Sequence, residues 1–264
     1  MGPEAQVESR DQPAPSLVGP IDVQRNLRGQ IRRRGEKGPG STSAELADDL
    51  ESLNRGLAPF DLSLDAAASA RVLRFAEALL EWNWRLNLIS RADAPNVIRK
   101  HVAASLGVFL AVPPSAGVHW LDIGTGGGFP GLVMKMARPD ISIALLESAR
   151  KRCIFLEEMI RTLDLTPLPV YQLRAETFIA KGDGIRSFGA VTTRAVASLS
   201  DSLRNFGPLV ADGGRFITFK GPDWLEELQE SEKQGVLSET GFQLEASIRL
   251  PWTPSQVIAL RRTT

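Results

Sequence analysis

Short apolar runs alternate with amphipathic stretches along the second half of the 264-residue chain, starting at Val118. Apolar runs bounded by Gly, Pro or polar residues are typical of buried strands, whereas apolar residues at helical spacing are typical of helices that bury one face. Strands that alternate with helices form a largely parallel sheet with helices on both faces. The predicted strands cover residues 118–123, 141–147, 168–173, 188–193, 214–220, 241–249 and 255–262, and the predicted helices cover 130–137, 149–163, 199–209 and 222–235.

The last two predicted strands have no helix between them. Pro251 and Pro254 lie in the short connection, where a helix cannot continue. Two strands joined by a short turn are antiparallel, because a parallel pair needs a long crossover connection. The chain is therefore predicted to form a Rossmann-like, mostly parallel, seven-stranded α/β sheet that ends in an antiparallel hairpin.

Upstream of the sheet, the apolar pattern changes to helical spacing. Helices are predicted at 43–54, with Ser43 as the N-cap, at 65–88 and at 94–110. The preceding segment is rich in Pro, Gly, Arg and Ser and has too little apolar surface to offset the entropy of ordering. We expect it to be disordered, and an RNA-contacting arm is the alternative. The predicted division is a disordered extension at 1–42, a helical cap at 43–112 and a sheet domain at 113–264.

Charge and cysteine usage narrow the class of protein. The chain has 31 Lys and Arg against 31 Asp and Glu, so no strong overall field favours nucleic acid or membrane. No apolar run is long enough to span a bilayer, and the N-terminus lacks the apolar core of a signal peptide. The single cysteine, Cys153, excludes an internal disulfide and favours a reducing cytoplasm. With two histidines and one cysteine, we expect no metal site.

The strongest chemical signal lies between the first predicted strand and the first predicted helix, in Asp122-Ile-Gly-Thr-Gly-Gly-Gly-Phe-Pro-Gly131. A strand, a Gly-rich turn and a helix together hold a nucleotide-like ligand at the carboxyl end of a parallel sheet. A dinucleotide fingerprint requires a third Gly where this chain has Phe129, so that interpretation fails. An acidic residue followed by Gly124 and Gly126 instead suits S-adenosylmethionine, which has no pyrophosphate.

Three further positions at strand ends fit the same ligand. Glu147 ends the second strand, where a carboxylate can accept hydrogen bonds from both hydroxyls of a ribose. Ala175 and Glu176 follow the third strand, where an adenine would lie, and the small Ala175 permits close stacking. Arg194 ends the fourth strand, where methyl donor and acceptor must meet. The alternatives are a solvated Glu that caps the next helix and an Arg that forms a surface salt bridge.

Together these residues resemble one known family, the bacterial small-subunit rRNA guanine-N7 methyltransferases, also called glucose-inhibited division protein B. The resemblance covers about residues 45–262 and implies a class I S-adenosylmethionine-dependent methyltransferase, with 113–264 as the methyltransferase domain. The matching elements are 122–131, Leu146-Glu-Ser148, Lys151-Arg152, Phe155-Leu156, Arg174-Ala-Glu176, Thr193-Arg-Ala-Val-Ala-Ser-Leu199, Lys220-Gly221 and, upstream, Trp82-Asn83, Asn87-Leu88 and His101.

The resemblance implies methyl transfer from S-adenosylmethionine to N7 of guanine-527, in the loop near position 530 of 16S rRNA. The residues that match the family's cofactor contacts are Gly124, Phe129, Ala175, Glu176 and Arg194. Arg194 is also the candidate for positioning the reactants. The family usually has Asp-Ser-Leu after its upstream His, whereas this chain has Ala104-Ser-Leu106, so any role of that Asp is absent. The family's second strand commonly ends in Asp, whereas Glu147 keeps the carboxylate one methylene further out.

The scarcity of His, Cys and metal ligands agrees with this target. Guanine N7 carries an unprotonated lone pair, so it needs no general base and the enzyme mainly positions the two reactants. Signatures of other methyl acceptors are missing. Cys153 lies mid-helix rather than after Pro, as pyrimidine C5 methylation commonly requires, and no Asn/Asp-Pro-Pro-aromatic run follows the fourth strand.

The expected partner is 16S rRNA, in the small ribosomal subunit or in an assembly intermediate. The candidate RNA contacts are Lys151, Arg152, Arg194 and Lys220, which would form a basic rim around the site; an ordinary solvated charge mixture is the alternative. We expect no membrane partner, and nothing in the sequence demands more than a monomer. Two other functions stay open, a small-molecule class I methyltransferase and a non-catalytic ribosome-assembly factor with a relic cofactor site.

Overall fold

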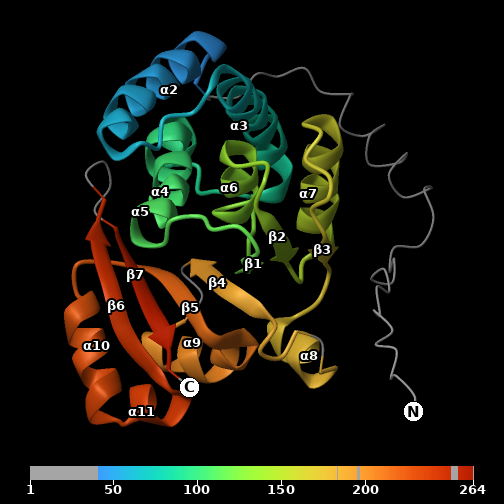
Figure 1. The fold of residues 1–264 in the computed structure, drawn as a ribbon. Coiled ribbons are helices and arrows are strands. Elements are labelled where there is room, and N and C mark those ends of the chain that lie inside the picture. Colours follow the sequence, from blue (N-terminus) through green and yellow to red (C-terminus); the bar gives the residue numbers. More distant parts are fainter. Residues whose placement is uncertain (1–40, 183, 195–196, 251–254, 264) are drawn as a thin grey trace, which may run out of the picture. The chain divides into compact units, whose positions relative to one another are not determined.

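The computed structural model describes residues 41–182, 184–194, 197–250 and 255–263, which form a seven-stranded sheet (Figure 1). Of the extension predicted at 1–42, all but the last two residues lie outside this described part. The strands are β1 (His119–Ile123), β2 (Ser142–Leu146), β3 (Val170–Tyr171), β4 (Phe188–Arg194), β5 (Val210–Lys220), β6 (Phe242–Arg249) and β7 (Gln256–Arg262).

The strands lie in the order β3-β2-β1-β4-β5-β7-β6. β1 pairs in parallel with β2 on one side and with β4 on the other, whereas β7 is antiparallel to both β5 and β6. The predicted parallel sheet with an antiparallel C-terminal hairpin is confirmed. Because the strand order reverses between β1 and β4, the carboxyl end of β1 is the topological switch point, where such sheets bind ligands.

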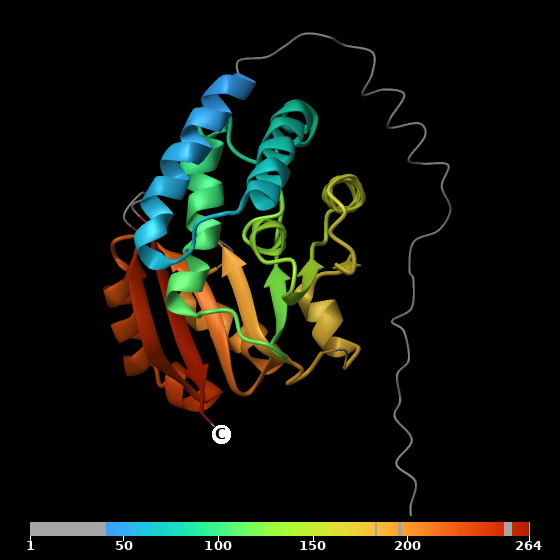
Figure 2. The same ribbon diagram turned by 45° about the horizontal axis from the view of Figure 1, so that its top comes forward.

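Helices cover both faces of the sheet (Figure 2). Side chains alternate along each strand, so Trp120 of β1 packs in one hydrophobic cluster and Leu121 in another. The first cluster includes the N-terminal helices, α6 (Gly131–Ala137) and α7 (Arg150–Thr162); the second includes α8 (Ala175–Ala180), α9 (Leu199–Phe206), α10 (Trp224–Lys233) and α11 (Val236–Thr240). Within the described residues, no helix is long and apolar enough to cross a membrane.

The first two predicted helices are confirmed, with one correction. α2 (Ser43–Leu57) is capped by Thr42, whose Oγ1 accepts a hydrogen bond from the backbone N–H of Glu45, while the Glu45 carboxylate accepts one from the backbone N–H of Thr42. The prediction of Ser43 as the N-cap is therefore wrong by one residue. α3 (Ala66–Leu86) packs against α6 and α7.

The third predicted helix, at 94–110, is wrong as a single element. Pro95 lacks the N–H that a helix interior requires, and the chain there forms only a 3-10 turn. Gly107 lies so close to Leu250 that an added Cβ would overlap it. The observed pieces are η2 (Ala94–Asn96), a π-helical turn η3 (Ile98–Val102), α4 (Ala103–Leu106) and α5 (Val108–Ala111).

Two short helices and one helix end were missed by the sequence pattern. α8 and α11 have six and five residues, too few to show a helical period. The helix predicted at 199–209 ends at Phe206 and continues as a 3-10 turn, η4 (Gly207–Leu209), because Pro208 follows.

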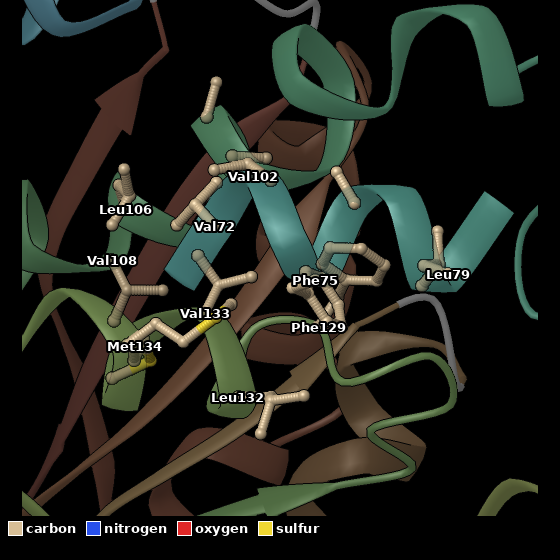
Figure 3. Close-up of a cluster of buried hydrophobic side chains, with 14 of the residues drawn as sticks. Val72, Phe75, Leu79, Val102, Leu106, Val108, Phe129, Leu132, Val133 and Met134 are labelled. Atoms are coloured by element: carbon tan, nitrogen blue, oxygen red, sulfur yellow. The ribbon is translucent and has the colours of Figure 1, made fainter. Parts of the chain in front are cut away.

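Phe75 of α3 connects the N-terminal helices to the Gly-rich turn (Figure 3). Its side chain is fully buried, and its ring meets that of Phe129 edge-on, with the ring centroids 5.5 Å apart. The ring of Phe155 on α7 lies 6.3 Å from the Phe75 centroid. Aromatic packing of this kind adds to the burial of apolar surface, so Phe129 is held from the side of the core.

Replacing Phe75 with Ala should destabilise the fold by about 3–5 kcal/mol, because it leaves a cavity in a close-packed cluster. Urea unfolding followed by circular dichroism measures this loss. Leu225→Ala, at a residue 48% exposed on α10, is the control and should cost about 0.5 kcal/mol or less. Equal losses in the two variants would contradict the close packing around Phe75.

Candidate functional site

The Gly-rich turn leaves the carboxyl end of β1 at the switch point of the sheet. Gly124 and Gly126 have φ values of +67° and +56°, in the left-handed region that favours glycine. Among the described residues, apart from Gly126 and its two chain neighbours, the only atom within 4 Å of a Cβ added to Gly126 is the carbonyl oxygen of Gly124, at 3.8 Å. The space beside this backbone is therefore open, as close approach of a ligand requires.

Glu147 holds this turn against the next helix. Its Oε2 accepts a hydrogen bond from Gly126 N at 3.0 Å, and its Oε1 accepts one from Ala149 N at 2.8 Å. Arg152 Nη1 lies 3.7 Å from Oε2. The residue is 4% exposed, so the solvated Glu of the alternative interpretation is wrong, although its contact with Ala149 does anchor the start of α7. The carboxylate still has lone pairs for a diol.

Asp122 is buried at the base of the turn. Its Oδ2 accepts a hydrogen bond from Gly131 N, the first residue of α6, at 2.8 Å, and its Oδ1 accepts one from Thr192 Oγ1 of β4 at 3.0 Å. Burial raises the pKa of the carboxyl from 3.8 to about 6, and the hydrogen bonds and the charge of Arg194 oppose that rise. A Cβ on Gly131 would lie 2.8 Å from Asp122 Oδ2, so this approach of helix to strand requires glycine.

Arg194 ends β4 with its guanidinium largely buried. Its Cζ lies 5.6 Å from the ring centroid of Phe219 on β5, in a cation–π contact. Burial lowers the pKa of the guanidinium, and the carboxylates of Asp93 and Asp122 oppose this. Nη1 is buried with no hydrogen-bond partner among the described residues. A buried donor without a partner costs free energy, which a ligand oxygen would recover.

Ala175 and Glu176 open α8, at the carboxyl end of β3. Ala175 is buried and Glu176 is exposed. Because β3 pairs in parallel with β2, both residues lie on the same edge of the sheet as Glu147. The structure places them at the predicted edge, and their contact with an adenine stays a prediction.

The side chains predicted to contact RNA differ in their exposure and in whether their charge is already paired. Lys151 is exposed in the first turn of α7, next to the half-buried Arg152. Lys220, the last residue of β5, is largely buried, and its Nζ donates to Ala197 O at 3.1 Å and to Glu227 Oε1 at 2.9 Å. Lys220 therefore ties α10 to the segment after β4, and its contact with RNA stays a prediction.

These residues fit S-adenosylmethionine. The open backbone at Gly126 accepts a close ligand, the Glu147 carboxylate faces the same turn, and Arg194 ends the neighbouring strand β4 on the same edge of the sheet. In the part of the chain that the structure describes, no three His, Cys, Asp or Glu residues are grouped so as to hold a metal ion. The sheet order and this turn define a class I methyltransferase, whose methyl donor is S-adenosylmethionine.

Comparison with known proteins identifies the family. Residues 68–246 match the family described as rRNA small subunit methyltransferase G, and the chain belongs to that family. It is therefore an S-adenosylmethionine-dependent methyltransferase that acts on small-subunit rRNA, and the resemblance found in the sequence is confirmed.

Several relatives share most of this length. Ribosomal RNA small subunit methyltransferase G from Geobacillus kaustophilus is 40% identical over 171 residues, which are 64% of this chain and 71% of that protein. The protein of the same name from Alkaliphilus oremlandii is 34% identical over 189 residues, 72% of this chain and 78% of its own. Among solved structures, a ribosomal protein L11 methylase from Lactobacillus delbrueckii covers 62% of this chain and 77% of its own, with 18% identity and a TM-score of 0.46.

Replacing Asp122 with Asn should change how stability depends on pH. Because folding raises the pKa of this carboxyl from 3.8 to about 6, the unfolded chain releases the proton first as the pH rises. Deprotonation of Asp122 should therefore lower the free energy of unfolding by roughly 3 kcal/mol between about pH 4 and pH 7. Asn does not titrate, so the variant should not show this decrease. In urea unfolding without ligand, the free energy of unfolding of the variant should rise relative to that of the unsubstituted chain from pH 4 to pH 7. A difference that does not change with pH would contradict the raised pKa.

Replacing Gly126 with Ala should separate ligand binding from folding. The new Cβ enters open space, so the fold should lose about 1–2 kcal/mol for a left-handed Ala. Binding of S-adenosylmethionine, measured by titration calorimetry, should weaken at least about tenfold, because a methyl group then occupies the ligand's space. Gly117→Ala is the matched control and should bind normally, since Gly117 has φ of +78° and, beyond its chain neighbours, no described atom lies within 4 Å of an added Cβ. Unchanged affinity in Gly126→Ala would place the donor elsewhere.

Proposed function

We propose that this chain transfers the methyl group of S-adenosylmethionine to N7 of guanine-527, in the 530 loop of 16S rRNA. The observation that carries the proposal is the open backbone at Gly126 beside the buried Glu147, inside the stretch at 68–246 that matches the rRNA methyltransferase family. A relic site would have no need to keep a backbone open to a ligand. The relatives named above carry the name ribosomal RNA small subunit methyltransferase G.

The donor would be held along the carboxyl edge of the sheet. Gly124 and Gly126 admit it to the turn, and Glu147 accepts hydrogen bonds from its ribose hydroxyls. Ala175 and Glu176 flank its adenine at the start of α8. Phe129 and Arg194 complete the set, with Arg194 directing Nη1 toward the reactants. When bound, S-adenosylmethionine supplies an electrophilic methyl group on a positively charged sulfur.

The acceptor requires position rather than proton transfer. N7 of guanine carries a lone pair, and the enzyme gains rate by holding it in line with the methyl group. The base gains positive charge as N7 is methylated. Nearby carboxylates favour that charge. Asp93 and Asp122 are the candidates, because both lie close enough to Arg194 to stabilise the charge of its guanidinium. The protein therefore needs no general base at this site.

The finer context also belongs to the proposal. The substrate is 16S rRNA within the small ribosomal subunit or an assembly intermediate, and the enzyme works as a cytoplasmic monomer. Residues 43–112 form the helical cap and 113–264 the methyltransferase domain. Lys151 and Arg152 approach the phosphates, which agrees with the exposure of Lys151 and the partial exposure of Arg152 at the start of α7.

Transfer of tritiated methyl groups to 30S subunits from a strain that lacks this gene tests the proposal, with the modified base mapped by aniline cleavage. We expect cleavage at guanine-527. Arg194→Ala should lower the rate of methyl transfer at least about a hundredfold, because reactants that are held about 1 Å out of place react that much more slowly. It should leave the protein folded, at a cost of about 1–2 kcal/mol for the lost cation–π contact with Phe219. Arg138→Ala, which breaks an ion pair with Asp140 at the amino end of β2, is the control and should keep the rate.

The other outcomes point to the alternatives. No incorporation, with S-adenosylmethionine still bound in calorimetry, would favour a small-molecule acceptor or another assembly stage. No binding would favour a relic site in a ribosome-assembly factor. Full turnover by Arg194→Ala would remove Arg194 from the site.

A further inference from the structure

His101 is a buried polar residue that the roles assigned so far do not use. It lies in the π-helical turn η3, and such turns occur often at functional sites. Its side chain is 12% exposed, and its Nε2 is buried with no hydrogen-bond partner among the described residues. Asp93 Oδ2 is 3.7 Å from Nε2, which is beyond hydrogen-bond distance.

The surroundings of His101 place it at the donor site. Its ring packs on the ring of Phe129, with centroids 5.0 Å apart and the planes tilted by 34°. Phe129 ends the Gly-rich run and is one of the proposed cofactor contacts. The charge of Arg194 also acts on the imidazole. His101 therefore lies against the end of the Gly-rich run and within electrostatic range of Arg194, the last residue of β4.

The imidazole is neutral at physiological pH. Burial, with smaller effects from Arg194 and Lys100, lowers the pKa of His101 to about 4, although Asp93 opposes the shift. A neutral imidazole carries one proton, and the facing carboxylate of Asp93 favours the tautomer with that proton on Nε2. Asp93 is nevertheless too far away to accept that proton, so His101 Nε2 and Arg194 Nη1 are two buried N–H donors with no hydrogen-bond partner among the described residues.

We propose that His101 Nε2–H and Arg194 Nη1–H together donate hydrogen bonds to O6 of the target guanine, and so select guanine over adenine. This inference rests on the proposed function. At the edge beside N7, guanine presents only acceptors, N7 and O6, whereas adenine presents the N6 amino donor next to N7. Two donors at O6 leave N7 free to face the methyl group. An adenine amino group would meet both donors unpaired, which is costly in a buried site.

A neutral histidine suits this position better than a charged one. Methylation puts positive charge on the base, and a second cation beside Arg194 would oppose it. Asp93 compensates part of the Arg194 charge, and it also holds Lys100 through an ion pair of 2.6 Å. The arrangement therefore supplies donors for O6 without adding a second positive charge.

A double-mutant cycle between the side chain and the base oxygen tests the contact. The substrates are 30S subunits reconstituted with guanine or with 2-aminopurine, which lacks O6, at position 527. The enzymes are the unsubstituted chain and His101→Leu, compared by single-turnover methyl transfer. His101→Leu should lose about 10- to 100-fold on guanine, the value of a buried hydrogen bond. Replacing guanine with 2-aminopurine slows both enzymes. The fold-loss in rate for His101→Leu should be at least about fivefold smaller than the fold-loss for the unsubstituted enzyme.

Two variants and one binding measurement separate this role from a structural one. His101→Gln keeps an N–H donor near Nε2 and should recover most of the rate that His101→Leu loses. His119→Gln, at the amino end of β1 beside Ser142, is the matched control and should be unaffected. The affinity for S-adenosylmethionine, measured by calorimetry, should stay within about threefold in each variant.

Three results would overturn the proposal. The first is a rate of His101→Leu on 2-aminopurine that is lowered by the product of the two separate fold-losses, which would show that His101 does not touch O6. A large loss of S-adenosylmethionine affinity would assign His101 to the donor. A His101→Gln rate as low as that of His101→Leu would show that the donor is not what matters. If the unsubstituted enzyme methylates neither substrate, the proposed function itself fails, which is distinct from any failure of His101.

Discussion

The buried carboxylate of Asp122 joins the end of β1, the start of α6 and the middle of the sheet. It accepts hydrogen bonds from the backbone N–H of Gly131 and from the hydroxyl of Thr192. The Gly-rich turn runs from Asp122 to Gly131, so both of its ends are held by this one side chain. Burying a carboxylate is costly, and the hydrogen bonds offset that cost only while helix and strand keep this close approach. The conformation of the turn depends on this interaction.

The aromatic packing behind the turn connects it to the N-terminal helices. Phe75 on α3 contacts both Phe155 on α7 and Phe129 at the end of the Gly-rich run. On another side, Phe129 meets His101 of η3. The helices upstream of the sheet therefore do more than cover one of its faces, because they place a buried histidine against the Gly-rich run.

Parts of the site that lie within one local pattern could be predicted from the sequence. The Gly-rich turn and Glu147 follow apolar strands, and the carboxyl ends of parallel strands share one edge. Lys220 shows where this argument stops. It follows a strand as predicted, but its charge is paired with Glu227, because α10 packs beside the strand end. Its Nζ also donates to the carbonyl of Ala197, 23 residues away in the sequence, so which charges stay free depends on how the segments pack.

The sequence alone determined the order of the seven strands along the chain, the position of the Gly-rich turn and the family, since these follow from apolar period, glycine spacing and motif. Only the tertiary structure decided that Asp93, His101 and Arg194 act on one another, because they lie on separate segments between 93 and 194. It also decided that Glu147 anchors the turn and that Arg194 Nη1 is buried with no hydrogen-bond partner in the described part of the chain. Burial and the pairing of polar atoms are properties of packing, and no local pattern in the chain specifies them.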